Sequence, residues 1–178
     1  MKNESTAFTE TDLQGFLDEM IDHDRLALAD RLQRASERLA EYGPLVPAAH
    51  GQEGVPPQAE GWSAHEVLAH IVVLSKFYGV VFHKVSSGKM TELDLLNNVG
   101  LRDAMDEQMA QIEPKELVRM ALEDHARTIK GLRGADATSM RRVVKVDGGE
   151  TMTAEEVARL PLISHLELHI DQLARALA

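Results

Sequence analysis

The chain has 178 residues, a formal net charge of −10, 44% hydrophobic residues and no cysteine. This length and apolar content suit one folded domain spanning residues 1–178. The acidic balance argues against a nucleic-acid partner and against an anionic membrane surface, because both require clustered cationic side chains. The lack of cysteine excludes disulfides, thiolate metal sites and cysteine nucleophiles, and it favours an intracellular, cytoplasmic location.

No segment has the pattern of an export signal or a membrane span. The first residues lack a basic segment followed by an apolar one, so we expect no signal peptide. The longest apolar-rich stretch, 67–82, contains Lys76 and is too short to cross a bilayer. We therefore expect no membrane partner.

The first predicted helix runs from Asp12 to Tyr42, because apolar residues recur there at three- and four-residue spacings. Thr9 and Thr11 are alternative N-caps, and Gly43 with Pro44 ends the helix. Residues 44–61 are rich in proline and glycine and predict a long extended connector.

The next three predicted elements are also helical. Ser63 and Glu66 form the S-x-x-E pattern of a capping box, which opens a helix that reaches about Val85. A third helical region covers 91–112, with a break at 97–100 as an alternative. Pro114 suits a first helical position, and the apolar periodicity continues from there to Leu132.

The C-terminal part begins with the strand-like run 141–146, which is followed by an Asp-Gly turn signal. A short hairpin and an irregular crossover are both compatible with this pattern. A last helix begins at Thr151 or Thr153, and Pro161 should kink it just before His165. Long amphipathic helices joined by a long connection predict an all-α fold, a four-helix bundle whose core holds any metal or cofactor site.

Three of the eight histidines lie on predicted apolar helix faces. His70 shares the stripe of the second helix with Val67 and Leu74. His165 and His169, one turn apart on the last helix, project from the same face roughly 6 Å apart, which suits adjacent positions on one metal ion. A third imidazole from a facing helix would leave open positions for water or substrate. The alternative is a hydrogen-bonded core histidine, which is the commoner role of a single inward imidazole.

The other histidines are weaker candidates. His23 lies among acidic residues on a helix surface, and His83 lies near a helix C-terminus, where the helix dipole favours it. His50 falls in the connector and His65 in the first turn after the cap. His125 is a distant fourth ligand candidate.

Two segments resemble a known superfamily. The segment 61–71, GWSAHEVLAHI, is similar to the W-[ST]-x-x-[ED]-V-[LI]-x-H-[LI] segment of the DinB-like and mycothiol-dependent maleylpyruvate isomerase-like proteins. The segment 165–173, HLELHIDQL, resembles their H-x-x-x-H-x-x-Q-[LI] segment. The resemblance implies a DinB-like up-down-down-up bundle that holds a divalent metal, zinc or nickel, through His70, His165 and His169. It also implies that Trp62 packs below the second helix, whereas the residues themselves favour a staple before the Ser63 cap.

The resemblance further implies a small-molecule substrate and a low-molecular-weight thiol of the mycothiol or bacillithiol type. The last-helix segment of the maleylpyruvate isomerases reads E-x-x-x-H-x-x-D-L and those enzymes have a second domain, so we expect a related activity rather than isomerisation. The favoured function is a metal-dependent S-transferase, since a chain without cysteine must borrow its thiol. A metal-dependent hydrolase and a non-catalytic metal-binding bundle are the alternatives. Wide apolar helix faces are also compatible with a homodimer.

Overall fold

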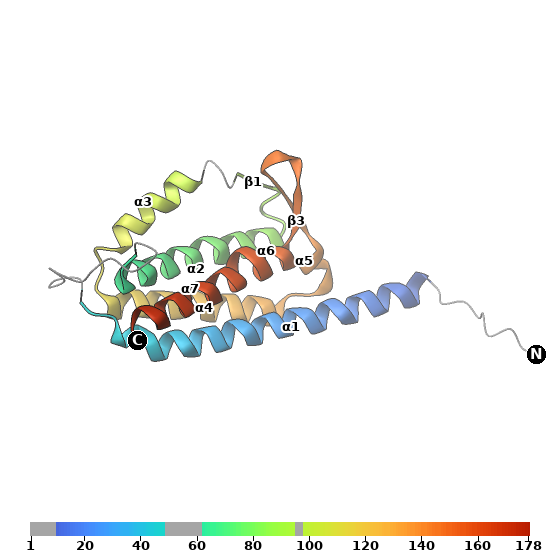
Figure 1. Cartoon of the computed structure of the whole chain (residues 1–178). Coiled ribbons are helices and arrows are strands. Elements are labelled where there is room, and N and C mark those ends of the chain that lie inside the picture. The colour runs from blue at the N-terminus through green and yellow to red at the C-terminus, as the bar shows by residue number, and fades with distance from the viewer. Residues whose placement is uncertain (1–9, 49–61, 95–97) are drawn as a thin grey trace, which may run out of the picture.

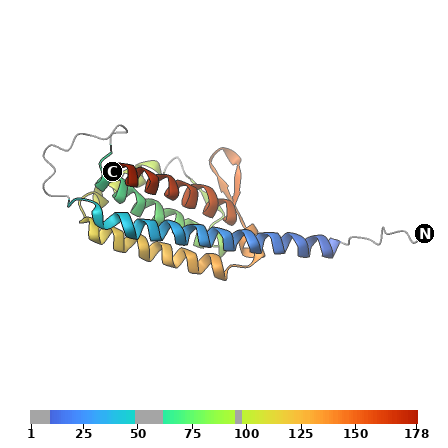
Figure 2. The ribbon, with the colours of Figure 1, turned by 60° about the horizontal axis from the view of Figure 1, so that its bottom comes forward.

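The structure, a computed structural model, describes residues 10–48, 62–94 and 98–178. Its four main helices are α1 (Glu10–Tyr42), α2 (Ala64–Ser86), α4 (Pro114–Gly134) and α7 (His165–Ala176). α1 and α2 each contact both α4 and α7. In Figure 1, α1 and α7 run toward the end of the bundle that carries the C-terminus, while α2 and α4 run away from it. Figure 2 shows α1 between α4 and α7. The predicted up-down-down-up bundle is therefore confirmed.

The predicted boundaries of these helices agree with the structure. α1 begins at Glu10 rather than Asp12 and ends at Tyr42, as predicted; the candidate cap Thr9 lies outside the described residues. The predicted capping box of α2 is present, because Ser63 Oγ accepts from the Glu66 N–H (3.2 Å) and the Glu66 carboxylate accepts from the Ser63 N–H (2.7 Å). These two bonds satisfy backbone donors that the helix itself leaves without partners.

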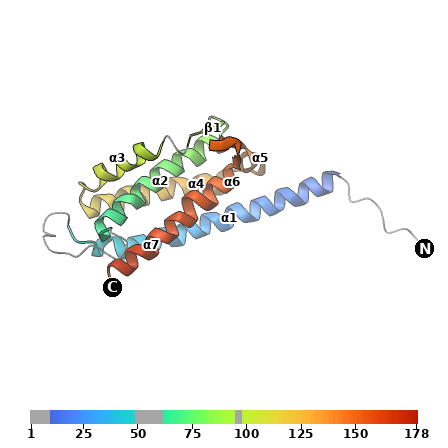
Figure 3. The same cartoon turned by 45° about the horizontal axis from the view of Figure 1, so that its top comes forward.

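The predicted third helix is wrong in its first part. Glu92–Leu93 forms strand β1, which pairs in parallel with β2 (Val143–Val146), and helix α3 spans Val99–Met109. Periodicity along one segment cannot reveal a pairing with a strand fifty residues away. Residues 95–97, close to the expected break, and 49–61 of the connector lie outside the described residues. α3 contacts α2 and lies along its outer side (Figure 3).

A hairpin connects the bundle to its last helix, so the hairpin interpretation was right. β2 pairs antiparallel with β3 (Thr151–Thr153), with Val144 opposite Met152, and β1 completes a three-stranded sheet in the order β1-β2-β3. The turn uses Gly148 and Gly149 at φ of 79° and 84°, a backbone conformation that glycine adopts without steric cost. The short helix α5 (Ala137–Arg141) precedes β2 and was not predicted.

The last helix changes its geometry at Pro161. α6 (Ala154–Val157) begins with a second capping box, between Thr153 and Glu156, which selects Thr153 over Thr151. A π-helical segment, Ala158–Ser164, then contains Pro161 and leads directly into α7. Proline has no N–H to donate and crowds the carbonyl four residues back, and the wider π turn accommodates both defects. The predicted perturbation before His165 is therefore present, as a π segment.

α2 is the central helix of the core. Nearly all of its apolar side chains are buried, among them Leu68, Ile71 and Phe82. Among the described helices, α2 has the length and apolarity of a membrane span, with 72% of its most apolar window buried in the protein. The helix has 23 residues, so the expectation that this segment is too short was wrong. Its packing inside the bundle accounts for its apolar composition.

Candidate metal centre

The three histidines singled out from the sequence come together between α2 and α7. His70 projects from the N-terminal third of α2, and His165 and His169 project from one face of α7. One ligand nitrogen from each ring lies within 4.8 Å of the other two. Ring centroids are 4.7 Å apart for His70 and His169, 4.8 Å for His165 and His169, and 5.9 Å for His70 and His165. These spacings are short enough for all three rings to face one ion.

Two of the rings are oriented by hydrogen bonds to their Nδ1 atoms. Nδ1 of His70 lies 2.9 Å from Oδ2 of Asp106, a residue of α3. Nδ1 of His169 lies 2.8 Å from Oε1 of Gln172, one turn further along α7. A carboxylate and a carbonyl oxygen accept hydrogen bonds, so each ring carries its proton on Nδ1 and leaves Nε2 as an electron-pair donor. Partners of this kind fix the tautomer and orientation of metal-ligating histidines.

The buried rings are held neutral. Burial lowers the pKa of His169 to about 4, an effect reinforced by His70 and His165 and opposed by the bond to Gln172. Burial also lowers the pKa of His165, with further contributions from His70 and Arg102 and with the backbone carbonyl of Pro161 opposing them. Neutral imidazoles are the form that binds metals, so no proton has to be displaced from these two at neutral pH.

Nε2 of His169 is one of the buried polar atoms that lack a hydrogen-bond partner among the described residues. His169 is 9% exposed, and its Nε2 atom has no hydrogen-bond partner among the described residues. A buried acceptor without a partner costs about 1–3 kcal/mol. A cation shared with His70 and His165 would satisfy this atom, so the donor set fits a metal ion.

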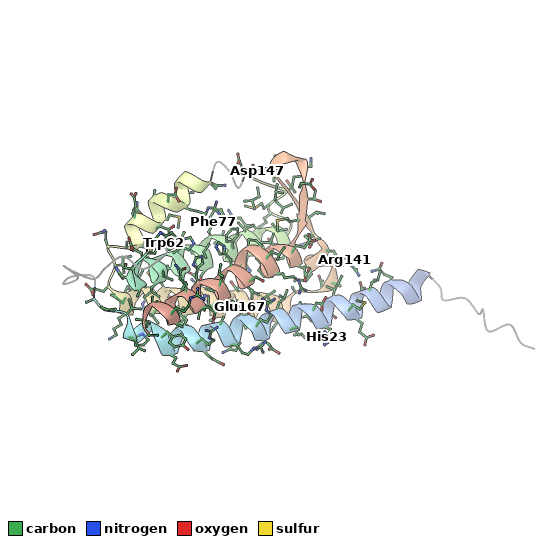
Figure 4. The ribbon with its side chains drawn as sticks, viewed as in Figure 1. His23, Trp62, Phe77, Arg141, Asp147 and Glu167 are labelled. Carbon is green, nitrogen blue, oxygen red and sulfur yellow. The ribbon has the colours of Figure 1, made fainter. Side chains whose placement is uncertain are left out.

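A cavity of about 420 Å³ opens beside His70. Its wall comes from Trp62, from α2 and from α3, and consists of Trp62, Glu66, His70, Asp103, Asp106, Glu107, Ala110 and Gln111. Trp62 lies between α3 and the bundle (Figure 4). Its ring contacts that of His70 edge-on at 4.9 Å and stacks on that of His169 at 6.0 Å. Trp62 therefore borders the histidine cluster, a position that the staple interpretation did not anticipate.

The other histidines that the structure describes are not part of the cluster. His23 is exposed on α1, as expected (Figure 4), and His83 is an exposed residue of the last turn of α2. His65 is buried, with Nε2 2.8 Å from the carbonyl oxygen of Ile112. His125, the proposed fourth ligand, lies in the core between two serines and is not part of the cluster. His50 lies outside the described residues.

On α7, the two carboxylates that neighbour these histidines in the sequence form ion pairs with α1. Glu167 turns toward α1, where it pairs with Arg31 (2.5 Å), and Asp171 pairs with Arg38 (2.6 Å). Neither faces the cluster, so neither is positioned to move a proton there. Glu66, the capping-box residue of α2, lines the same cavity as His70.

Comparison with known proteins supports the fold independently. No family model and no curated protein matches the sequence. Two solved structures do match: the mycothiol-dependent maleylpyruvate isomerase, with a TM-score of 0.65, and a histidine-to-alanine variant of that isomerase, with a TM-score of 0.66. Each has 18% sequence identity to this chain, and the match covers 85% of this chain. The chain has a DinB-like fold.

This DinB-like chain spans 60% of the length of those isomerase structures. At this level of identity the likeness concerns the fold, and it agrees with the resemblance drawn from the two sequence segments. The sequence analysis missed Asp106. No local signal identifies this residue, because only the packing of α3 on α2 brings its carboxylate to His70.

Proposed function

We propose that His70, His165 and His169 bind one divalent metal ion, and that the protein is a metal-dependent enzyme of the S-transferase type. The observation that carries the proposal is the buried Nε2 atom of His169, which has no partner among the described residues, in a ring that belongs to a group of three histidines with one ligand nitrogen each within 4.8 Å of the others. Imidazole donors suit zinc and nickel. A site with three protein ligands leaves a further position for a substrate, as in catalytic rather than structural zinc sites.

Two observations support a thiol cosubstrate: the lack of cysteine in this chain and the mycothiol dependence of the structurally similar isomerase. A metal ion held by three imidazoles lowers the pKa of a bound thiol or water toward the physiological range. The chain has no cysteine, so a sulfur nucleophile must come from a cosubstrate. The neighbouring isomerase is described as mycothiol-dependent, which supports a low-molecular-weight thiol of the mycothiol or bacillithiol type.

In the proposed reaction the thiol loses its proton and its sulfur forms a bond to a small electrophile. The electrophile either releases a leaving group or, when it is an unsaturated carbonyl compound, takes up a proton at the neighbouring carbon. The chain's own contribution is positioning. Asp106 and Gln172 hold two rings in the ligating tautomer, Trp62 covers one side of them, and the 420 Å³ cavity beside His70 has room for a small substrate.

The same proposal places the protein in the cytoplasm, where low-molecular-weight thiols stay reduced. Its partners are then small molecules, with neither nucleic acid nor a membrane involved, and the active form is a monomer or a homodimer.

Metal content tests the site directly. Protein purified without a histidine tag, before and after reloading with Zn²⁺ or Ni²⁺, should contain about one equivalent of metal by elemental analysis. His169→Ala should abolish this binding, and His23→Ala, which removes an exposed histidine of α1, should leave it unchanged. Less than about half an equivalent after reloading, or equal binding by the two variants, would overturn the site.

Activity tests the reaction class. The loaded protein should conjugate mycothiol, bacillithiol or glutathione to a generic electrophile faster than the His169→Ala variant does. Ester or amide hydrolysis without added thiol would identify a hydrolase instead. Full metal occupancy with neither activity would favour the non-catalytic metal-binding bundle.

A further inference from the structure

We propose that the molecule entering the cavity beside His70 carries a positively charged ammonium group. The inference rests on the proposed function for the reacting end of that molecule, and on the cavity itself for its charge. The wall contains four carboxylates, those of Glu66, Asp103, Asp106 and Glu107, and among the described residues no lysine or arginine lines it. A cavity lined by one sign of charge concentrates ligands of the opposite sign.

Two of these carboxylates, Glu66 and Asp106, are hydrogen-bonded to neighbouring protein groups. Glu66 accepts two bonds from Ser63 in the capping box, and Asp106 accepts from His70 through Oδ2. Asp103 and Glu107 are exposed and lie four residues apart on α3, on the same side of the helix. Like charges at this spacing repel each other, and a bound cation between them would relieve that repulsion.

The aromatic wall favours the same charge. Trp62 is 38% exposed and is the one tryptophan of the chain. The face of an indole ring attracts organic cations, with a gain of about 0.5–2 kcal/mol that increases as water is excluded. Carboxylates together with an indole ring are the surroundings that an alkylammonium group prefers.

A separate observation points to a ligand at this place. The His169 Nε2 atom is buried without a partner among the described residues, and the His169 ring lies 4.7 Å, centroid to centroid, from that of His70, which forms part of the cavity wall. A molecule bound at the histidine cluster can therefore extend past His70 into the acidic cavity. His70 is the residue that the cluster and the cavity wall share, so the proposed ligand has its reacting end at the cluster and its charged end in the cavity.

Two other occupants fit less well. In the described part of the chain, the three histidines are the group whose donor atoms converge enough to share a metal ion, and the carboxylates of the cavity form no second such group. An organic cation, with its spread charge, suits separated carboxylates better. An anion would need a cation in the wall, and Arg102, the nearby cation on α3, instead donates to the Tyr78 hydroxyl and packs over Phe77.

Trp62 provides a direct test, because its fluorescence reports on the cavity without any assay of activity. Metal-free and Zn²⁺-loaded protein would be titrated at low ionic strength with n-butylammonium and with butyrate, two ligands of similar size and opposite charge. We expect butylammonium to bind at least about tenfold more tightly than butyrate to either form. Equal affinities, or a preference for butyrate, would overturn the proposal.

A matched pair of double variants distinguishes the effect of the cavity carboxylates from the effect of the protein's net charge. Asp103→Asn/Glu107→Gln should reduce the preference to about twofold, since it removes the two solvent-facing charges. Glu37→Gln/Glu41→Gln removes an equally spaced, exposed acidic pair of α1 and should keep the preference. Equal loss in both double variants would show that net charge, not the cavity, selects the ligand.

The loaded protein tests the link with the proposed function. With Co²⁺ as a spectroscopic metal, 2-aminoethanethiol should perturb the spectrum at lower concentration than 3-mercaptopropionate does. A protein that binds no metal but still prefers butylammonium would refute the proposed function and keep the cavity inference. Metal binding without any preference for the cationic ligand would refute the cavity inference and leave the proposed function standing.

Discussion

At the scale of single residues, the candidate centre depends on atoms outside the three rings. His70 and His169 each place Nδ1 against an oxygen, Oδ2 of Asp106 or Oε1 of Gln172, and this leaves Nε2 of each ring directed away from those partners. Gln172 could be expected from the sequence as a partner of a ligand or substrate, because it follows His169 by one helical turn. Asp106 could not, because it belongs to another helix.

We expect Asp106→Ala to weaken metal binding about 10–100-fold, because the His70 ring loses the partner that sets its tautomer and orientation. Competition with a chromophoric chelator measures this affinity. Asp171→Ala is the matched control: it removes a carboxylate two residues from His169 that pairs with Arg38 rather than with a ring. If both variants lose affinity equally, the effect of Asp106 is one of charge and not of positioning.

At the scale of elements, the close contact between α1 and α4 requires a glycine at one position and not at another. A Cβ atom added to Gly43, at the end of α1, would lie 2.3 Å from Cγ2 of Val118 on α4. A Cβ atom added to Gly15, within α1, would meet nothing within 4 Å. The same substitution should therefore have opposite effects at the two positions.

Gly43→Ala should lower the free energy of unfolding by about 1–3 kcal/mol, because Val118 or the α1–α4 contact must shift to admit the methyl group. Gly15→Ala should raise it by about 0.5–1 kcal/mol, since alanine favours the helical backbone. Urea denaturation of both variants measures the two changes. A neutral or stabilising effect of Gly43→Ala would contradict the close contact between α1 and α4.

At the scale of the whole molecule, a buried polar group joins three helices of the bundle. His125 of α4 is 1% exposed and lies 2.8 Å from Oγ of Ser36 on α1 and 2.8 Å from Oγ of Ser75 on α2. A neutral imidazole donates from one nitrogen and accepts at the other, so it can bond to both serines. Burial lowers the pKa of His125 to about 4, and the charge of neighbouring Asp124 opposes the shift.

This shift makes stability depend on pH. Between the ordinary histidine pKa of about 6.5 and the lowered value, the unfolded chain takes up a proton that the native protein does not, so the free energy of unfolding falls as the pH falls. From pH 7 to pH 4.5 the loss attributable to His125 should be about 2 kcal/mol.

His125→Leu should remove this contribution, because leucine does not titrate. Ser36 and Ser75 already lie within hydrogen-bonding distance of the carbonyls of Leu32 and Ile71, which remain as acceptors for their hydroxyls. Urea denaturation of metal-free protein at the two pH values measures the difference between wild type and variant, in which the other titrating groups cancel. A difference that does not change with pH would show that the pKa of His125 is the same in the folded and the unfolded protein.

The sequence by itself determined the local features of this protein. The helix start at Ser63 could be read because a capping box needs only residues three apart. The last helix could be placed only at Thr151 or Thr153, and the Asp-Gly signal indicated a turn because glycine accepts positive φ. The inward positions of His70, His165 and His169 followed from helical periodicity, which a single segment contains. Tertiary structure alone decided β1, the place of His125 in the core and the approach of Asp106 to His70. Each of these depends on contacts between segments far apart in the chain, and their energies come from packing and pairing that no local pattern records.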